Sequence, residues 1–246
     1  MLLTPECAPR KRAKLVAALS LKPKLPLNAK CLDIGTSNGQ LIYFIIENED
    51  WTFVDPDPIC LDIAKKILKG NFILAKGASA LQDILENKYQ LITLFDIIPY
   101  IEDLDVFLKL IRTRLSLDGY LLMTSVSHNE KSYMHKLRER YGLNLLRGFK
   151  MNYTTKEVQQ LLIENNFKIN KLSLFSGFFI ESFQLVIDMM ASKDESHYGT
   201  LTQRHLSPKS YLLHLLKYMT QVTMLFDRIF FFLPRYSFVI LAEIER

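Results

Sequence analysis

The residues with the clearest chemical potential lie in a glycine-containing turn between a short apolar segment and a helical segment. The stretch from Cys31 to Gly39 reads CLDIGTSNG. Gly35 lets the backbone turn sharply and approach a ligand, and the free N–H groups that open the following helix favour polar or negatively charged groups. Asp55 follows twenty residues after Gly35, at the end of the next predicted strand. A carboxylate there can accept hydrogen bonds from both hydroxyls of a ribose, so this spacing indicates a nucleoside ligand.

Other interpretations are compatible with the same stretch. A dinucleotide-binding loop needs G-x-G-x-x-G, but Ser37 and Gln40 stand where the second and third glycines would be. The turn is also a literal G-x-S-x-G, the pattern of a serine hydrolase nucleophile elbow. Ser37 would then be the nucleophile and Asp96 the acid, and the base would be one of the later histidines, His128, His197 or His205. Such an elbow normally follows several strands, whereas one predicted strand precedes it here. A turn that binds no ligand is the simplest alternative.

In the order and spacing of these residues the chain resembles the class I S-adenosylmethionine-dependent methyltransferases. Their first motif is an acid followed by G-x-G-x-G after the first strand. Asp33, Gly35 and Gly39 match it, and Ser37 replaces the middle glycine. The resemblance implies S-adenosyl-L-methionine as the cofactor, with Asp33 near the methionine amino group. It also implies that the turn, including Thr36 and Ser37, wraps the methionine part.

The same resemblance assigns further contacts to the cofactor. Asp55 would bind the ribose, and Pro56 would lie beside the adenine. Gly77 and Ala78 stand where the family has its third motif, an acid followed by alanine. Phe95 ends the fourth predicted strand, directly before the family's fourth motif, and is included in the predicted cofactor site.

The expected reaction is methyl transfer to an oxygen or nitrogen atom of an unidentified acceptor. Because the sulfonium carries the driving force, the protein must mainly align the acceptor and exclude water. A general base helps if the acceptor is a hydroxyl or a protonated amine, and Tyr100 and His128 are the candidate catalytic residues. Ser37, Gly77 and Pro99 depart from the family pattern. A non-catalytic cofactor-fold module within a complex therefore stays open as an alternative.

Alternating strands and helices must position these residues. Predicted strands cover 30–34, 51–55, 71–75, 89–95, 120–125, 167–175 and 237–244. Predicted helices cover 10–21, 40–48, 59–68, 78–86, 104–115, 128–141, 154–165 and 209–226. Asp118-Gly119 is expected to be a turn into the fifth strand, and Thr154 or Thr155 an N-cap. This order predicts an α/β fold with a doubly wound, mostly parallel seven-stranded sheet, helices on both faces, and a helical insertion before the last strand.

The composition suits one globular domain. The chain has 246 residues, 49% of them hydrophobic, and a formal net charge of +5. We expect a single methyltransferase domain over 1–246, with a basic helical segment in 1–29 and a cap or insertion in 176–234. The three cysteines have no paired spacing, which argues against a disulfide framework or zinc site and favours a cytoplasmic protein. No metal site is expected, and no window is apolar enough to span a membrane.

The acceptor is less well defined by the sequence. Two basic stretches, 10–30 and 131–150, favour an anionic acceptor such as a phosphate-bearing lipid intermediate or glycan precursor, and aromatic residues between the charges also permit RNA. The segment 209–234 is apolar nearly all round, which suits a buried cap helix, a peripheral membrane contact or a dimer face. The oligomeric state is left open.

Overall fold

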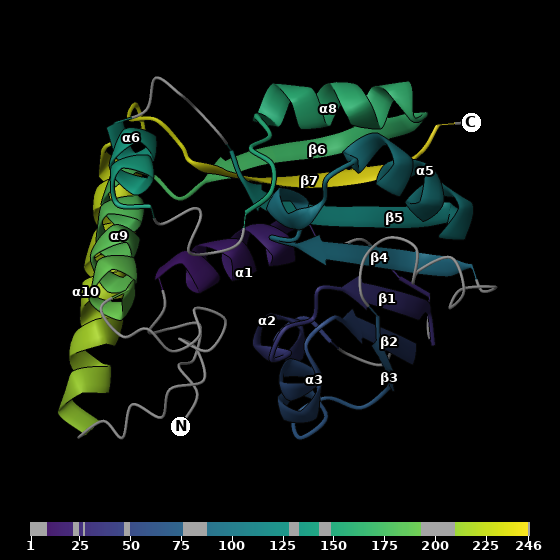
Figure 1. The fold of residues 1–246 in the computed structure, drawn as a ribbon, viewed down its shortest axis with the longest axis horizontal. Coiled ribbons are helices and arrows are strands. Elements are labelled where there is room, and N and C mark those ends of the chain that lie inside the picture. Colours follow the sequence, from purple (N-terminus) through teal and green to yellow (C-terminus); the bar gives the residue numbers. More distant parts are fainter. Residues whose placement is uncertain are drawn as a thin grey trace.

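The computed structural model describes residues 9–21, 25–26, 28–46, 50–75, 88–127, 133–142, 149–192 and 210–245. Within them, seven strands form one sheet in the order β3-β2-β1-β4-β5-β7-β6 (Figure 1). The strands are β1 (Lys30–Ile34), β2 (Asp50–Asp55), β3 (Asn71–Leu74), β4 (Tyr89–Phe95), β5 (Leu115–Val126), β6 (Phe167–Phe175) and β7 (Ser237–Ile244). Each coincides with a predicted strand to within a residue, except that β5 begins earlier.

The sheet reverses its strand order between β1 and β4. The chain moves outward from β1 through β2 and β3, then crosses back so that β4 pairs with the other side of β1. The first five strands run parallel, and β7 runs antiparallel to both β5 and β6. The predicted mostly parallel α/β sheet is confirmed. Ligands of such sheets bind at the carboxyl ends of the strands where the order reverses, and the turn after β1 lies there.

Helices cover both faces of the sheet, as predicted. They are α1 (Pro9–Leu21), α2 (Gln40–Tyr43), α3 (Pro58–Ala64), α5 (Leu104–Arg114) and α8 (Thr155–Glu164). Successive side chains of a strand point to opposite faces. On β4, Ile92 and Leu94 join the core under α5 and α8, whereas Leu91 joins the core under α1, α2 and α3. Since both faces are covered, the central strands are mostly apolar, with a few buried polar residues such as Asp33 and Thr93.

Three further helices gather beyond the carboxyl edge of the sheet, at the left of Figure 1. They are α6 (Tyr133–Arg140), α9 (Phe178–Ser192) and α10 (Ser210–Ile229). Helix α9 packs against α6 and α10, and α1 lies between this group and the sheet, in contact with α9 and α10 (Figure 1). Helix α10 carries apolar residues on its exposed side, among them Tyr218 and Leu225, while Thr220 and Asp227 are buried.

Some helix predictions were wrong in extent. Helix α2 ends at Tyr43 instead of continuing to residue 48, because the aromatic and β-branched residues that follow are poor helix formers. Helix α9 was not predicted as a helix. Helix α8 has the predicted N-cap, Thr154, within a capping box closed by Glu157. The predicted helix 78–86 and the first part of the predicted helix 128–141 lie outside the described residues.

The predicted turn at Asp118-Gly119 lies inside β5, as a bulge. Tyr89 pairs with Leu115 and Leu91 with Tyr120, so the residues between Leu115 and Tyr120 are left out of the pairing. Regular pairing of β5 begins at Tyr120, where the fifth strand was predicted to start. Among the described helices, none has the length and hydrophobicity to cross a membrane.

Candidate active site

The turn after β1 is fastened to the neighbouring strand β2. The N–H groups of Gly35 and Thr36 both donate to the carbonyl oxygen of Val54, at 2.8 and 3.2 Å. Gly35, Ser37 and Gly39 adopt left-handed backbone conformations, with φ of 79°, 53° and 74°. Glycine enters this region freely, whereas serine does so at an energetic cost. The backbone conformation of the turn therefore favours glycine at positions 35 and 39, where the motif has its first and third glycines.

Packing gives both glycines a second reason. A Cβ atom on Gly35 would lie 2.0 Å from Cγ2 of Ile97, and one on Gly39 would lie 2.6 Å from Cδ1 of Leu68. Ile97 belongs to the loop after β4, so the two loops at the reversal of strand order are in direct contact. Any side chain at Gly35 would push this loop away from the turn.

Asp55 ends β2 beside this turn and is buried. Its Oδ2 accepts a hydrogen bond from the N–H of Ser37 at 2.6 Å, and its Oδ1 accepts one from the N–H of Asp57 at 2.9 Å. Burial raises the pKa of Asp55, and the two amide donors oppose that effect. Each carboxylate oxygen has a further lone pair, so the side chain can still accept two hydroxyl groups. Pro56, the next residue, is exposed.

Asp33, on β1, is almost completely buried, with 1% of its surface exposed. The hydroxyl of Thr93 donates to its Oδ1 at 2.6 Å, and the hydroxyl of Thr36 donates to its backbone carbonyl at 3.2 Å. Burial raises the pKa of Asp33 to about 7, and the nearby charge of Asp55 adds to the rise. A buried carboxyl of this kind is stabilised in its ionised form by a cationic group.

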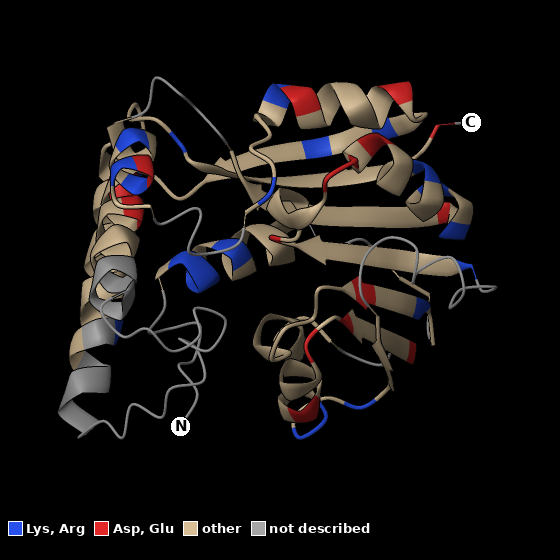
Figure 2. Ribbon diagram, in the orientation of Figure 1, with Lys and Arg blue, Asp and Glu red and all other residues tan. Residues whose placement is uncertain are grey.

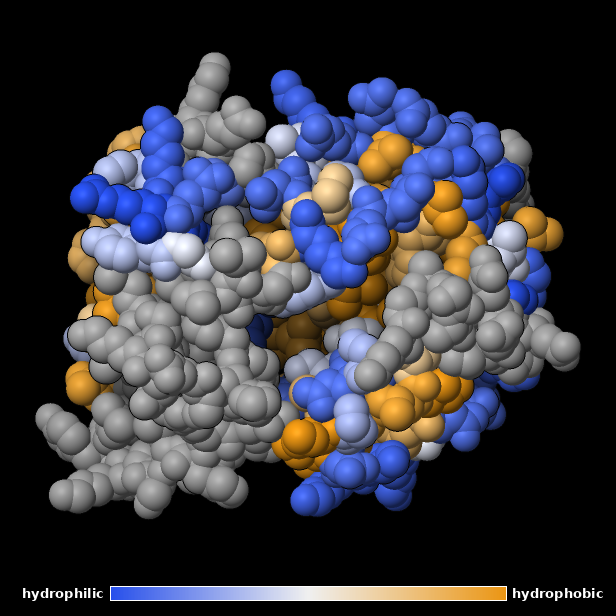
Figure 3. Space-filling model, in the orientation of Figure 1, coloured by the Kyte–Doolittle hydropathy of each residue, from blue (hydrophilic) through white to orange (hydrophobic). Residues whose placement is uncertain are grey.

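The two acids therefore flank the turn on adjacent strands. Asp33 suits a ligand ammonium group, and Asp55 suits a pair of hydroxyls, as on a ribose. S-adenosylmethionine carries both kinds of group, an ammonium on its methionine part and a pair of hydroxyls on its ribose, so the two carboxylates fit that cofactor. Figure 3 shows the surface hollowed at this edge of the sheet, between the regions of α1 and α2, with hydrophobic side chains at the bottom of the hollow.

The remaining predicted site residues lie in different surroundings. Phe95 is half-buried at the end of β4 and packs against the core that α1 covers. Tyr100 belongs to the short helix η1 (Ile98–Tyr100), is 46% exposed, and contacts the ring of Phe149 edge-on at 5.3 Å between centroids. The predicted residues Gly77, Ala78 and His128 fall outside the described residues.

The structure adds Asp96, which was noted only as a candidate hydrolase acid. It follows β4, has a φ of 58°, accepts a hydrogen bond from the Thr124 hydroxyl at 3.2 Å, and forms an ion pair with Lys14 of α1. Burial alone would raise the pKa of Asp96, but the charges of Lys14 and Arg10 lower it below its ordinary value. Figure 2 shows these basic residues along α1, beside the carboxyl ends of the strands.

Lys11 attaches the same helix to the turn. Its ammonium group donates to Oε1 of Gln40, the first residue of α2, at 2.6 Å. Burial lowers the pKa of Lys11 to about 7, and the charge of Lys14 contributes. The basic stretch 10–30 had suggested an anionic acceptor. Two of its lysines, Lys11 and Lys14, hold α1 against the candidate site, and their spacing of three residues on one helix face was the signal for a shared role.

Comparisons with known proteins agree with this geometry. A family model described as a methyltransferase domain matches residues 6–172, more than half of the chain. No curated protein matches the sequence.

Three solved structures share the fold. The [4+2]-cyclase SpnF is 12% identical with a TM-score of 0.63, over 96% of this chain and 80% of that one. A mycolic acid cyclopropane synthase in complex with SAH and CTAB is 16% identical with a TM-score of 0.60, over 93% and 81%. A SAM-dependent methyltransferase from Archaeoglobus fulgidus is 11% identical with a TM-score of 0.60, over 94% and 93%. None of these findings supports the serine hydrolase interpretation. The chain belongs to the class I S-adenosylmethionine-dependent methyltransferases.

Proposed function

We propose that the turn after β1 and the two acids beside it bind S-adenosylmethionine, and that the chain transfers its methyl group to an oxygen or nitrogen atom of an acceptor. The observation that carries this proposal is the placement of buried Asp33 and Asp55 on adjacent strands, on either side of a turn with two left-handed glycines. The proposed cofactor residues in the described part of the chain are Asp33, Gly35, Thr36, Ser37, Gly39, Asp55, Pro56 and Phe95. Gly77 and Ala78 stay predictions from the sequence.

The residues of the chain have separable roles in this proposal. Asp55 accepts the ribose hydroxyls, and Asp33 holds the ammonium group of the methionine part. Ile97 fills the space beside Gly35 and holds the loop after β4 against the turn that would bind the cofactor. The cofactor supplies the electrophilic methyl group, so the protein contributes mainly alignment and exclusion of water.

The acceptor is proposed to lie over the carboxyl ends of β4 and β5. Solved structures with this fold include a [4+2]-cyclase and a cyclopropane synthase, so the fold alone does not name the acceptor. Helices α1, α6 and α9 enclose that edge, and the basic residues of α1 and α6 favour an anionic acceptor. Tyr100 follows β4 and stays the candidate base in the described residues, and His128 stays a prediction.

Titration calorimetry with S-adenosylmethionine tests the cofactor site. We expect Asp55→Ala to weaken binding by at least tenfold, because hydrogen bonds to a charged group contribute about 1.5–3 kcal/mol each. Ser37→Ala is the matched control: Ser37 is proposed to serve the site through its backbone, whose N–H donates to Asp55, so loss of its hydroxyl should change binding little. Absence of binding by the folded wild-type protein would refute the proposal.

Turnover needs a separate test. Incubating the protein with radiolabelled cofactor and a whole-cell extract is expected to yield a labelled product. Cofactor binding without labelling of any product would instead support a non-catalytic module.

A further inference from the structure

A small cavity of about 50 Å³ lies at the carboxyl ends of β4 and β5. Its apolar walls come from the loops after these strands, from α6 and from the segment after α6, and include Pro99, Val126, Met134, Phe149 and Tyr153. Three charged side chains, one from each of α1, α6 and α9, also line it. This is the edge where the acceptor of the proposed reaction would lie.

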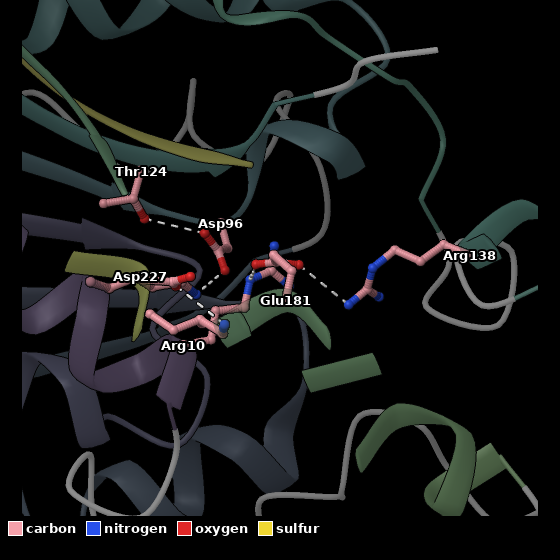
Figure 4. A network of polar contacts seen from close by, with 8 residues as sticks. Arg10, Asp96, Thr124, Arg138, Glu181 and Asp227 are labelled. Carbon is pink, nitrogen blue, oxygen red and sulfur yellow. Dashed lines mark hydrogen bonds and ion pairs between the residues drawn. The ribbon is translucent and has the colours of Figure 1, made fainter. Parts of the chain in front are cut away.

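The charged residues are Arg10, Arg138 and Glu181, and all three are buried, with exposed fractions of 6%, 8% and 2%. Nε of Arg10 lies 3.3 Å from one oxygen of Glu181, and Nη2 of Arg138 lies 3.5 Å from the other. Figure 4 shows the Glu181 carboxylate between the two guanidinium groups, with Asp96 close to Arg10. One carboxylate thus faces two guanidinium groups from different helices.

Arg10 is not satisfied by this arrangement. Its Nε and Nη2 atoms are buried and have no hydrogen-bond acceptor among the described residues, because the contact with Glu181 lacks hydrogen-bond geometry. A buried guanidinium group whose N–H donors are unused is costly, and an anion supplied by a ligand would remove that cost. The nearby Asp96 is already engaged by Lys14 and the Thr124 hydroxyl.

We propose that this cavity binds a carboxylate group of the methyl acceptor, held by the guanidinium group of Arg10 and supported by Arg138. This inference rests on the proposed function. A carboxylate matches the planar fork of arginine, and the small volume suits such a group better than a bulkier anion. The apolar walls then select a hydrophobic or aromatic carboxylic acid as the acceptor class. The carboxylate is the anchor, and the methylated atom lies elsewhere on the acceptor.

The position of Arg10 explains how this anchor would serve the reaction. Arg10 lies one helical turn before Lys14, which pairs with Asp96 at the end of β4, and β4 is the strand next to β1. An acceptor held at Arg10 therefore reaches from the ends of β4 and β5 toward the turn that holds the methyl donor. Arg10 is a binding residue in this scheme, not a base.

The test uses benzoate as the probe, with benzamide as its neutral analogue of similar shape. Binding to the full-length protein saturated with S-adenosylhomocysteine is measured by ligand-observed NMR titration up to millimolar concentrations. We expect benzoate to bind at least tenfold more tightly than benzamide, about 1.4 kcal/mol. We expect Arg10→Met to remove this preference and Arg10→Lys to retain part of it. Arg12→Met, two residues away on the same helix, is the matched control and is expected to keep the preference.

Several results would overturn the proposal. These are equal binding of benzoate and benzamide, absence of benzoate binding, an unchanged preference in Arg10→Met, or tighter binding of phenyl phosphate than of benzoate. Calorimetry with S-adenosylhomocysteine shows whether each variant keeps a folded cofactor site. The comparison of benzoate with benzamide on the wild-type protein does not depend on the folding of any variant. If the wild-type protein binds benzoate selectively but no cofactor, the proposed function fails and the anion site stands. If it binds cofactor without preferring benzoate, the anion site fails alone.

Discussion

Protonation of Asp33 is expected to control cofactor binding. In the cofactor-free protein, burial raises the pKa of this carboxyl to about 7, and the Thr93 hydroxyl donates a hydrogen bond to it. In the proposed complex, the ammonium group of S-adenosylmethionine lies against the carboxylate and favours its ionised form. Binding should therefore release a proton whenever Asp33 is protonated in the free protein.

The size of the effect follows from the pKa. With a pKa of about 7, about one tenth of the free protein has ionised Asp33 at pH 6 and about one hundredth at pH 5. The dissociation constant for S-adenosylmethionine should thus rise about tenfold for each pH unit below 7. Above pH 7 the contribution of Asp33 levels off, because its carboxyl is then mostly ionised. The direction is fixed by the raised pKa: affinity is lost as the pH falls and regained as it rises through 7.

Isothermal titration calorimetry measures both the affinity and the proton release. Titrations at pH 6 in phosphate and in bis-Tris, buffers with different ionisation enthalpies, should give a release of close to one proton per cofactor bound. Asp33→Asn cannot release this proton, so its weaker binding should not change between pH 5 and pH 8. Asp55→Asn serves as a control that keeps Asp33, and it should retain the pH dependence.

A pH-independent dissociation constant for the wild-type protein would refute the reasoning. So would equal heats in the two buffers at pH 6, because they would mean that no proton leaves the protein. A pH dependence of binding that persists in Asp33→Asn would mean that the titrating group is a residue other than Asp33.

Four further changes test the fold around the site. Asp33→Asn should stabilise the cofactor-free protein above pH 7 by up to about 4 kcal/mol, measured by urea unfolding. Burial raises the pKa of Asp33 from 3.8 to about 7, and each pKa unit is worth about 1.4 kcal/mol. No gain in stability at pH 8 would contradict the idea that Asp33 is buried in its ionised form. Asp227→Ala should cost about 1–3 kcal/mol, because its carboxylate accepts two N–H groups at the start of α9 at 2.8 and 3.2 Å. Gly35→Ala should lower the melting temperature, and adding Ile97→Ala should restore part of it; additive losses would show that the contact with Ile97 is not the cause. Thr154→Ala should cost about 1 kcal/mol through loss of the capping box and leave cofactor affinity unchanged.

Much of the sheet could be predicted because its signals are local. The strands at 30–34, 89–95, 167–175 and 237–244 were predicted with the bounds that the structure has, since apolar runs there end at turn residues. The acid at the end of the second strand and the glycines of the turn were likewise found from spacing alone. These features depend on the backbone conformation of a few consecutive residues, which the sequence encodes directly.

The features that were missed depend on contacts between distant residues. Helix α9 has its first N–H groups capped by Asp227 of α10, 48 residues after Phe179. The basic run at the start of the chain suggested an anionic acceptor, but Lys14 is paired with Asp96, 82 residues later. Arg10 of α1 and Glu181 of α9 meet only once these two helices pack together. No local pattern could indicate such partners, because their contacts are created by the tertiary fold.

The position of α1 has a consequence for how the chain reaches its folded state. This helix precedes every strand in the sequence, yet it packs on β6, β7, α9 and α10, which come last. Contacts of such large sequence separation form slowly, and during synthesis α1 must wait for nearly the whole chain before it can dock. Until then its alanine face, including Ala13, Ala17 and Ala18, has no partner. Chaperone binding or aggregation of nascent chains should therefore depend on this face, and closure of the site by α1 should be among the last events of folding.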